Sequence, residues 1–223
     1  MTIGIIVAMS KELGLILPML GNLTTEQRGC TTFHIGTLGS SRVVAMECGI
    51  GKVNAAIGAT TLIDSYSPDL VINTGVAAGA SSDVAVMDVV VATGLVHHDF
   101  WCIGEEWGHV PGSPLVFPVT DYPETVTGDH VKRGLIATGE LFITRKEEVD
   151  LICSRFPGVK AIDMESAAIA QACSLRGVPF FCMRVISDSP WSSHDNSRQY
   201  EDFWEDAPRH SFSLVSNLLE RLS

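Results

Sequence analysis

The chain has 223 residues, of which 46% are hydrophobic and 18% are charged, and its formal net charge at pH 7 is −11. This hydrophobic content excludes a disordered chain and is typical of a buried parallel sheet that helices cover on both faces. The negative charge excludes a nucleic-acid partner, because an acidic surface repels a phosphate backbone.

Strand and helix patterns alternate along the whole chain. In chain order, the predicted elements are a strand over 3–9, a helix over 13–20, strands over 33–38 and 42–47, a helix over 52–66, strands over 70–75, 88–96 and 134–138, a helix over 145–155, a strand over 160–163, a helix over 164–176, a strand over 178–187 and a helix after Pro208. Residues 97–122 and 191–198 are predicted loops, and the first is long enough to indicate a functional or interface loop. The alternation predicts one α/β domain over residues 1–223 with a mostly parallel sheet.

The six cysteines indicate a cellular compartment. None belongs to a CxxC pair, and several lie within apolar runs, where a reduced cysteine behaves as a small hydrophobic residue. We therefore expect a reducing cytoplasm. No basic segment precedes the first apolar run, so no signal peptide is expected. The apolar runs are too short and too often interrupted by glycine and charge to span a bilayer, so no membrane partner is expected either.

Several common motifs are incomplete in this chain. Gly49-Ile50-Gly51-Lys52 begins like a phosphate loop, but Val53 has no hydroxyl for magnesium and the upstream glycine is missing. His97 and His98 are the strongest metal candidates, yet adjacent residues on a strand point to opposite faces. We therefore expect no metal and no cofactor. A GxSxG sequence is absent, which argues against a serine hydrolase.

Two acidic clusters stand out in the C-terminal third, Asp163-Met164-Glu165 and Arg184-Val185-Ile186-Ser187-Asp188. Each lies where an apolar strand would deliver it to the rim of a sheet. Carboxylates are poor core residues and good acid–base catalysts. The clusters indicate an enzyme that donates a proton and holds a polar, electron-poor substrate.

These clusters and further segments are similar to those of 5′-methylthioadenosine/S-adenosylhomocysteine nucleosidases, within the purine nucleoside phosphorylase and uridine phosphorylase superfamily. The resemblance covers essentially the whole chain. It rests on residues 3–12, 49–56, 68–75, 139–143, 163–165 and 184–188. It implies three layers, α/β/α, with a twisted mixed sheet that is mostly parallel and partly closed into a barrel. It also implies a homodimer and hydrolysis of the bond between ribose C1′ and adenine N9, through a transition state resembling an oxocarbenium ion.

The resemblance implies two catalytic residues. Asp188 corresponds to the general acid at adenine N7, and protonation there lets the base leave as a neutral molecule. Such an aspartate needs an apolar or shielded environment that raises its pKa. Glu12 corresponds to the base that takes a proton from the attacking water. It follows the first strand at the carboxyl edge of the sheet, where sites in such folds usually lie.

The resemblance also implies a set of substrate-binding residues. Glu165 corresponds to the residue that grips the ribose hydroxyls, and Phe142 to the ring that stacks on adenine. Tyr200 corresponds to an aromatic residue that closes over the site, and Arg184 to the group that helps to fix Glu12 and the water. The full predicted binding set is Met9, Ile50, Ala77, Ala78, Phe142, Ile143, Met164, Glu165, Arg184, Ser187 and Tyr200. In this set the backbone of Ile143 reads the base edge, Met164 packs on the sugar, and Ser187 orients Asp188.

The chain departs from the family pattern at several positions. Val76 replaces a serine, Asp163 replaces a glutamate, and Glu140 replaces an aspartate. The largest departure is the loop over residues 97–111, which in the family lies near the partner subunit's active site and receives the 5′ substituent. In this loop Glu105 stands where an aromatic residue is expected. The departures concern the 5′ group more than the adenine chemistry.

Three alternatives remain open from the sequence. A nucleoside phosphorylase needs arginines to bind phosphate, whereas Lys11-Glu12 follows the first strand here. A hydrolase of futalosine-type nucleosides, with a bulkier 5′ group, is compatible with the altered loop. A catalytically inactive purine-binding protein would not need Glu12, Glu165 and Asp188 together.

Overall fold

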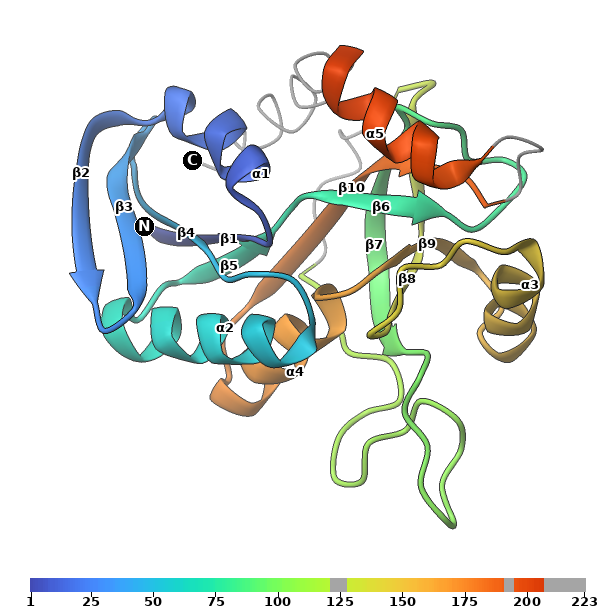
Figure 1. Cartoon of the computed structure of the whole chain (residues 1–223). Coiled ribbons are helices and arrows are strands. Elements are labelled where there is room, and N and C mark those ends of the chain that lie inside the picture. The colour runs from blue at the N-terminus through green and yellow to red at the C-terminus, as the bar shows by residue number, and fades with distance from the viewer. Residues whose placement is uncertain (121–127, 191–194, 207–223) are drawn as a thin grey trace.

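The computed structural model describes residues 1–120, 128–190 and 195–206. Its elements, in chain order, are β1 (Thr2–Val7), α1 (Ser10–Ile16), the short 3-10 helix η1 (Leu17–Met19), β2 (Gly21–Arg28), β3 (Thr31–Leu38), β4 (Ser41–Glu47), α2 (Lys52–Tyr66), β5 (Leu70–Asn73), β6 (Val76–Gly79), β7 (Val89–His97), β8 (Val131–Thr138), α3 (Lys146–Arg155), β9 (Val159–Asp163), α4 (Ser166–Arg176), β10 (Phe180–Asp188) and α5 (Asn196–Asp206) (Figure 1).

The described strands form one mixed sheet in the order β2-β3-β4-β1-β5-β10-β6-β9-β8-β7. Strand β10 belongs to both halves of this sheet. Its start pairs in parallel with β5, its middle pairs antiparallel with β7, and its end pairs in parallel with β6. The pairing of β10 with β7 closes β10, β6, β9, β8 and β7 into a five-stranded barrel. The predicted sheet, mostly parallel and partly closed, is confirmed.

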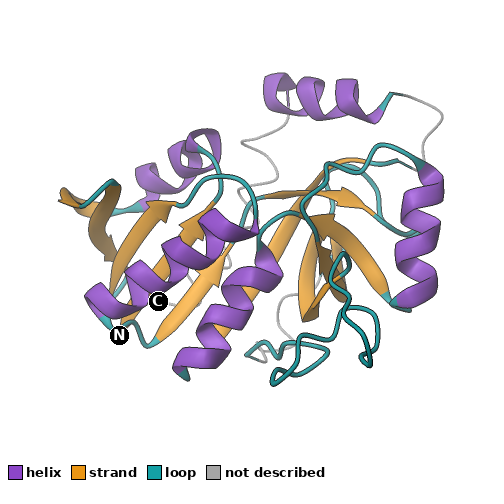
Figure 2. Ribbon diagram, turned by 60° about the horizontal axis from the view of Figure 1, so that its bottom comes forward, coloured by secondary structure: helices purple, strands orange, loops and turns teal. Residues whose placement is uncertain are grey.

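Helices cover both sides of the sheet. Helices α2 and α4 pack side by side on one side, and α1 and α5 lie on the other (Figures 1 and 2). Helix α4 is rich in alanine and buried over most of its length, which is typical of a helix enclosed by other elements. Gly177 ends it in the left-handed conformation with φ 66°. Within the described ranges, no helix is both long and apolar enough to cross a membrane.

Three elements differ from the sequence prediction. No element was predicted over residues 21–28, whose largely exposed side chains show no apolar alternation; strand β2 forms there as the outer strand of a hairpin with β3. Strand β6 was expected to be a loop of small residues, yet Val76–Gly79 pairs with β10 and β9. Helix α5 begins at Asn196, inside the predicted polar loop. The helix predicted after Pro208 lies outside the described residues.

Candidate active site

One cavity lies where β1, β6, β9 and β10 end. It leaves about 590 Å³ of empty space, part of it open to solvent. Twelve of the thirteen predicted site residues line it, namely Met9, Glu12, Ile50, Ala77, Ala78, Phe142, Ile143, Met164, Glu165, Ser187, Asp188 and Tyr200. The thirteenth, Arg184, lies behind it. The cavity therefore brings together segments from seven parts of the chain.

Glu12 is held in the first turn of α1 by three backbone N–H groups. Its Oε2 accepts hydrogen bonds from the N–H of Ala8 at 2.9 Å and of Met9 at 3.0 Å, and its Oε1 accepts one from Val76 at 2.9 Å. The side chain is buried, with the residue only 1% exposed. Burial raises the pKa of Glu12, while the charge of Arg184 and the three N–H groups lower it. Glu12 thus caps its helix and also faces the cavity.

Asp188 ends β10, and each of its carboxyl oxygens accepts one hydrogen bond. The Ser187 hydroxyl donates to Oδ1 at 2.8 Å, and the Asn196 side-chain amide donates to Oδ2 at 2.8 Å. Burial raises the pKa of Asp188, and the two donors, Asn196 first, lower it. The Ser187 bond is the contact predicted from the sequence. Asn196 was not predicted, because an asparagine within an apparently polar loop gives no sign that it will be buried.

Glu165 faces the cavity from the turn between β9 and α4. Its Oε1 accepts a hydrogen bond from the backbone N–H of Gly51 at 2.9 Å, immediately before α2 begins. Burial, followed by the negative charge of Asp163, raises the pKa of Glu165 to about 7, and the charge of Arg184 opposes this shift. A carboxyl group in this position can accept hydrogen bonds from hydroxyl groups in the cavity.

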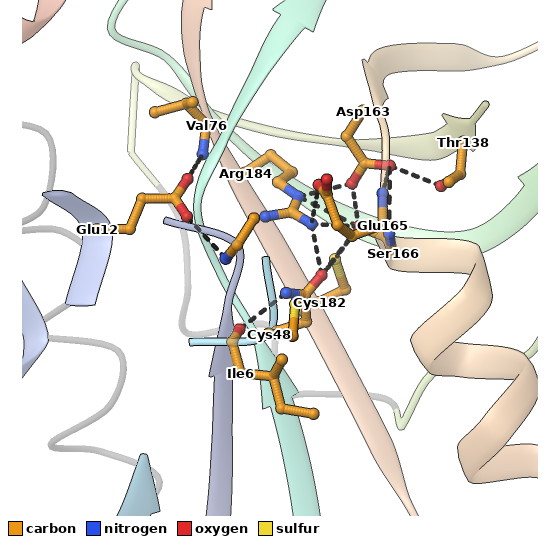
Figure 3. Close-up of polar contacts among 12 residues, drawn as sticks. Ile6, Glu12, Cys48, Val76, Thr138, Asp163, Glu165, Ser166, Cys182 and Arg184 are labelled. Atoms are coloured by element: carbon orange, nitrogen blue, oxygen red, sulfur yellow. Dashed lines mark hydrogen bonds and ion pairs between the residues drawn. The ribbon is translucent and has the colours of Figure 1, made fainter. Parts of the chain in front are cut away.

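Arg184 is fully buried at the centre of a polar network behind the cavity (Figure 3). Its Nε pairs with Asp163 Oδ2 at 2.7 Å, and its Nη2 donates to Asn73 Oδ1 at 2.5 Å and to Ser166 Oγ at 2.8 Å. Asp163 also accepts a hydrogen bond from Thr138 Oγ1 at 2.6 Å and one from the Ser166 hydroxyl. The network joins the carboxyl ends of β5, β8 and β9 to the middle of β10 beside the cavity.

Arg184 acts on Glu12 through its positive charge and not through a hydrogen bond. Among the described residues, Arg184 Nη1 has no hydrogen-bond partner, and no hydrogen bond joins this side chain to Glu12. The positive charge of Arg184 nevertheless lowers the pKa of Glu12. Arg184 therefore favours the ionised form of that carboxyl from behind the cavity wall.

An aromatic and thioether wall closes the other side of the cavity. The rings of Phe142 and Tyr200 meet edge to face, with centroids 5.6 Å apart. The Tyr200 hydroxyl donates to Met9 Sδ at 3.3 Å, which joins α5 to the end of β1. Ala77 and Ala78, on β6, line the same cavity, and the absence of larger side chains at these positions leaves space for a flat ligand. Ala8, Val76, Leu141 and Ile162 add to the apolar lining and were not among the predicted site residues.

The loop over residues 97–111 does not line this cavity. Trp101 and Trp107 stack with centroids 6.3 Å apart, and the Arg155 guanidinium lies 3.5 Å from the Trp107 ring centroid. Glu105, where the family pattern has an aromatic residue, forms an ion pair with His109. The described residues contain no cluster of histidine, cysteine, aspartate and glutamate that could hold a metal ion.

Comparisons with known proteins agree with this geometry. Residues 2–220 match the family model described as the phosphorylase superfamily. The 5′-methylthioadenosine/S-adenosylhomocysteine nucleosidase of Chromohalobacter salexigens is 40% identical over 99% of this chain and 97% of its own length. The namesake from an Exiguobacterium species is 41% identical over 100% and 99%.

Solved structures give the same result. The nucleosidase of Streptococcus pneumoniae with the transition-state inhibitor MT-ImmA has a TM-score of 0.91 and 34% identity, over the full length of both chains. The Colwellia psychrerythraea nucleosidase in complex with adenine has a TM-score of 0.87 and 34% identity, covering 100% of this chain and 96% of that one. The chain belongs to the 5′-methylthioadenosine/S-adenosylhomocysteine nucleosidase family of the phosphorylase superfamily.

Proposed function

We propose that this protein is a hydrolase that cleaves the N-glycosidic bond of 5′-methylthioadenosine and S-adenosylhomocysteine, releasing adenine and the corresponding 5-thio-ribose. One observation carries this proposal: two buried carboxyl groups, Glu12 and Asp188, line the same cavity and differ in the groups that contact them. Burial raises the pKa of both groups, but the positive charge of Arg184 and three backbone N–H groups oppose this shift at Glu12, whereas only two neutral side-chain donors oppose it at Asp188. We therefore assign the base to Glu12 and the acid to Asp188. Relatives that carry the nucleosidase name support the substrate assignment.

The two carboxyl groups divide the chemistry between them. The protonated carboxyl of Asp188 gives its proton to N7 of the purine while the bond from C1′ to N9 breaks, so the electron pair leaves with a neutral base. Ionised Glu12 takes a proton from a water molecule, and the resulting hydroxide bonds to the cationic C1′. Glu165 accepts hydrogen bonds from the ribose hydroxyls and stabilises the positive charge that develops on the sugar.

The charge of the cavity favours water over phosphate as the nucleophile. Neither arginine nor lysine is among the described residues that line it. Lys11, beside Glu12 in the sequence, instead lies over the Trp204 ring, 5.4 Å from its centroid. A phosphorylase needs cations that bind phosphate, and the Glu12 carboxylate would repel that anion. Hydrolysis therefore fits these residues better than phosphorolysis.

We also propose that the protein is a homodimer in which the loop over residues 97–111 lies near the partner's active site. Large apolar side chains are exposed on two neighbouring segments. Val53 and Ile57 project from α2, and Trp101 and Ile103 from the loop, with Ile103 91% exposed. Several large apolar side chains left exposed on neighbouring segments are typical of an interface between subunits. Light scattering coupled to size exclusion tests the proposal, and a monomeric mass at micromolar concentration would contradict it.

A cytoplasmic location completes the proposal. All six cysteines are free thiols, as expected in a reducing compartment. Burial raises the pKa of Cys173 and of Cys182 to about 12, which keeps both thiols protonated and unreactive. Cell fractionation followed by detection of the native protein tests this assignment.

The central test of the function is product analysis. The protein is incubated with methylthioadenosine, adenosylhomocysteine, inosine and futalosine, each with and without phosphate, and the released base is separated by chromatography. We expect adenine from the first two substrates, without stimulation by phosphate. Asp188→Asn should abolish adenine release while an adenosine analogue still binds, as measured by calorimetry. Retained turnover in that variant would remove Asp188 from the role of general acid.

A further inference from the structure

The side-chain amide of Asn196 joins two parts of the cavity wall. Its Nδ2 donates one hydrogen bond to Asp188 Oδ2 at 2.8 Å and another to the backbone carbonyl of Ile143 at 3.0 Å. Both hydrogens of the amide group are thus used. Asn196 is the first residue of α5, is only 4% exposed and does not line the cavity itself.

We propose that Asn196 is a positioning residue: it fixes the carboxyl group of Asp188 relative to the Ile143 carbonyl, so that the proton donor and the segment that reads the base keep one geometry. The role of Asp188 as proton donor rests on the proposed function. The geometric link between the two groups does not depend on that assignment. In this arrangement Asn196 acts through Asp188 and touches no substrate.

The chemistry of an amide suits this position. Each oxygen of Asp188 accepts one neutral donor, the Ser187 hydroxyl at Oδ1 and the Asn196 amide at Oδ2. Neither donor titrates near neutral pH, so neither takes over the role of acid. Both hydrogen bonds favour the carboxylate and therefore limit how far burial raises the pKa of Asp188.

Several charged or titratable groups surround Asp188. Glu12 from α1 and Glu165 from the turn before α4 line the same cavity, and so does Tyr200 from α5. Arg184 lies four residues earlier on β10 and pairs with Asp163. Among the described residues, none of these side chains forms a hydrogen bond with the Asp188 carboxyl, so loss of Asn196 should change the titration of Asp188 directly.

Helix α5 offers a matched control for this proposal. Gln199, one turn further along the helix, accepts a hydrogen bond from the backbone N–H of Ser189 at 3.0 Å. Gln199 therefore also fastens α5 to the segment after β10, but it touches neither the Asp188 carboxyl nor the Ile143 carbonyl. A change at Gln199 weakens the docking of α5 without removing a donor from Asp188.

The experiment compares Asn196→Leu and Gln199→Leu with the wild-type protein. The first measurement is the pKa of Asp188, which is determined by a ¹³C NMR titration of the carboxyl signals. The signal of Asp188 is assigned by its absence in Asp188→Asn. The second is the pH dependence of kcat/KM for adenine release from methylthioadenosine. In Asn196→Leu we expect the pKa of Asp188, and with it the alkaline limb of the profile, to rise by about one pH unit. We expect kcat to fall about tenfold with a smaller change in KM, because the acid loses its orientation.

The control should behave differently. Gln199→Leu should lower the melting temperature but leave the pKa of Asp188 and the alkaline limb at their wild-type positions. Asn196→Asp preserves the shape of the side chain and tests the proposal where the leucine variant does not fold. Two adjacent carboxyl groups would then share a proton, and the NMR titration should show two separated steps.

The outcomes separate the two claims. An unchanged pKa of Asp188 in Asn196→Leu, or a single unshifted step in Asn196→Asp, would overturn the positioning role whatever the activity. Failure of the wild-type protein to release adenine, together with the expected NMR shift, would overturn the proposed function and leave the positioning role in place. Equal effects of Asn196→Leu and Gln199→Leu on the NMR titration would reduce Asn196 to a helix-docking residue.

Discussion

Glu12 and Arg184 approach each other across Gly75, so that a Cβ atom at that position would overlap both Oε1 of Glu12 and Nη1 of Arg184. Gly75 has φ 152°, in the half of conformational space that favours glycine. Its neighbour Val76 donates its backbone N–H to Glu12 Oε1. The turn between β5 and β6 therefore brings a buried carboxylate and a buried cation together without a side chain between them.

Gly75→Ala should displace the Glu12 carboxyl and reduce kcat for adenine release at least a hundredfold, because a misplaced base loses most of its effect. Strain and overlap should also destabilise the protein by about 2 kcal/mol. Gly14→Ala is the control, since a Cβ atom there meets nothing within 4 Å and Gly14 is an exposed residue of α1. That variant should keep its activity and gain up to about 1 kcal/mol. Near-normal kcat in Gly75→Ala would show that the contact across the turn is unimportant.

Glu12→Gln should slow adenine release by about 10² to 10⁴-fold, because an amide cannot accept the proton of the attacking water. It should also remove the acid limb of the pH–rate profile, where the wild-type rate falls as Glu12 becomes protonated. The new NH₂ group would face backbone N–H groups of Ala8, Met9 or Val76, which now donate to carboxylate oxygens. This conflict should cost about 1–3 kcal/mol of stability.

Glu148→Gln separates catalysis from helix capping. Glu148 occupies the same N3 position in α3 and accepts hydrogen bonds from the N–H groups of Thr144 and Arg145. The substitution should cost less than about 1 kcal/mol, because this side chain is near the surface. The kcat of Glu148→Gln should equal that of the wild-type protein. If Glu12→Gln changed only stability, as Glu148→Gln should, Glu12 would be a capping residue and not the base.

Asp163→Asn should destabilise the protein by about 3–5 kcal/mol, because it leaves the buried charge of Arg184 without its closest anionic partner. The amide would also face the hydroxyl groups of Thr138 and Ser166, which donate to the carboxylate. Urea unfolding at constant pH measures the change.

An exposed ion pair gives the comparison for this variant. Asp64 pairs with Arg176 at 2.6 Å, and both side chains are about half exposed. Asp64→Asn should therefore change the free energy of unfolding by less than about 1 kcal/mol. Equal losses in the two variants would mean that the buried network contributes no more than a surface pair.

The sequence contains much of this site because its chemistry lies at strand ends. A carboxylate directly after an apolar strand, such as Asp188 or Asp163, has to lie at the rim of the sheet, and parallel strands bring those rims together. The sequence does not reveal that Arg184 lies behind the cavity wall. From its position on β10, the Arg184 side chain could lie in the cavity or behind its wall. The positions of its partners Asn73, Asp163 and Ser166 decide between the two.

Tertiary contacts explain the features that the sequence hides. The α5 segment, with the sequence NSRQYEDFWED, is largely polar. Its helix is docked by hydrogen bonds of Asn196, Gln199 and Tyr200 and by the buried ring of Phe203. Strand β2 likewise has almost no buried side chains and depends on pairing with β3. Local propensity does not determine either element, because the free energy comes from residues distant in the sequence.

Glu165 should make the stability of the protein depend on pH near neutrality. Its folded-state pKa of about 7 lies above the ordinary value of 4.5. Its contribution to stability is therefore complete below pH 4.5 and is lost as the pH rises through about 7. From this group alone, the free energy of unfolding should fall by about 2 kcal/mol between pH 5.5 and 8. Glu165→Gln should remove that part of the decrease, which urea unfolding at several pH values measures.

Glu140→Gln is the matched control for this pH dependence. Glu140 also accepts a hydrogen bond at the start of α2, from the backbone N–H of Lys52 at 3.0 Å, but its side chain is exposed. Because this side chain is exposed to solvent, the variant should keep the wild-type slope of stability against pH. If Glu165→Gln also kept that slope, Glu165 would be ionised throughout the range. Burial would then be outweighed by the N–H of Gly51 and the charge of Arg184, the two groups that favour its carboxylate.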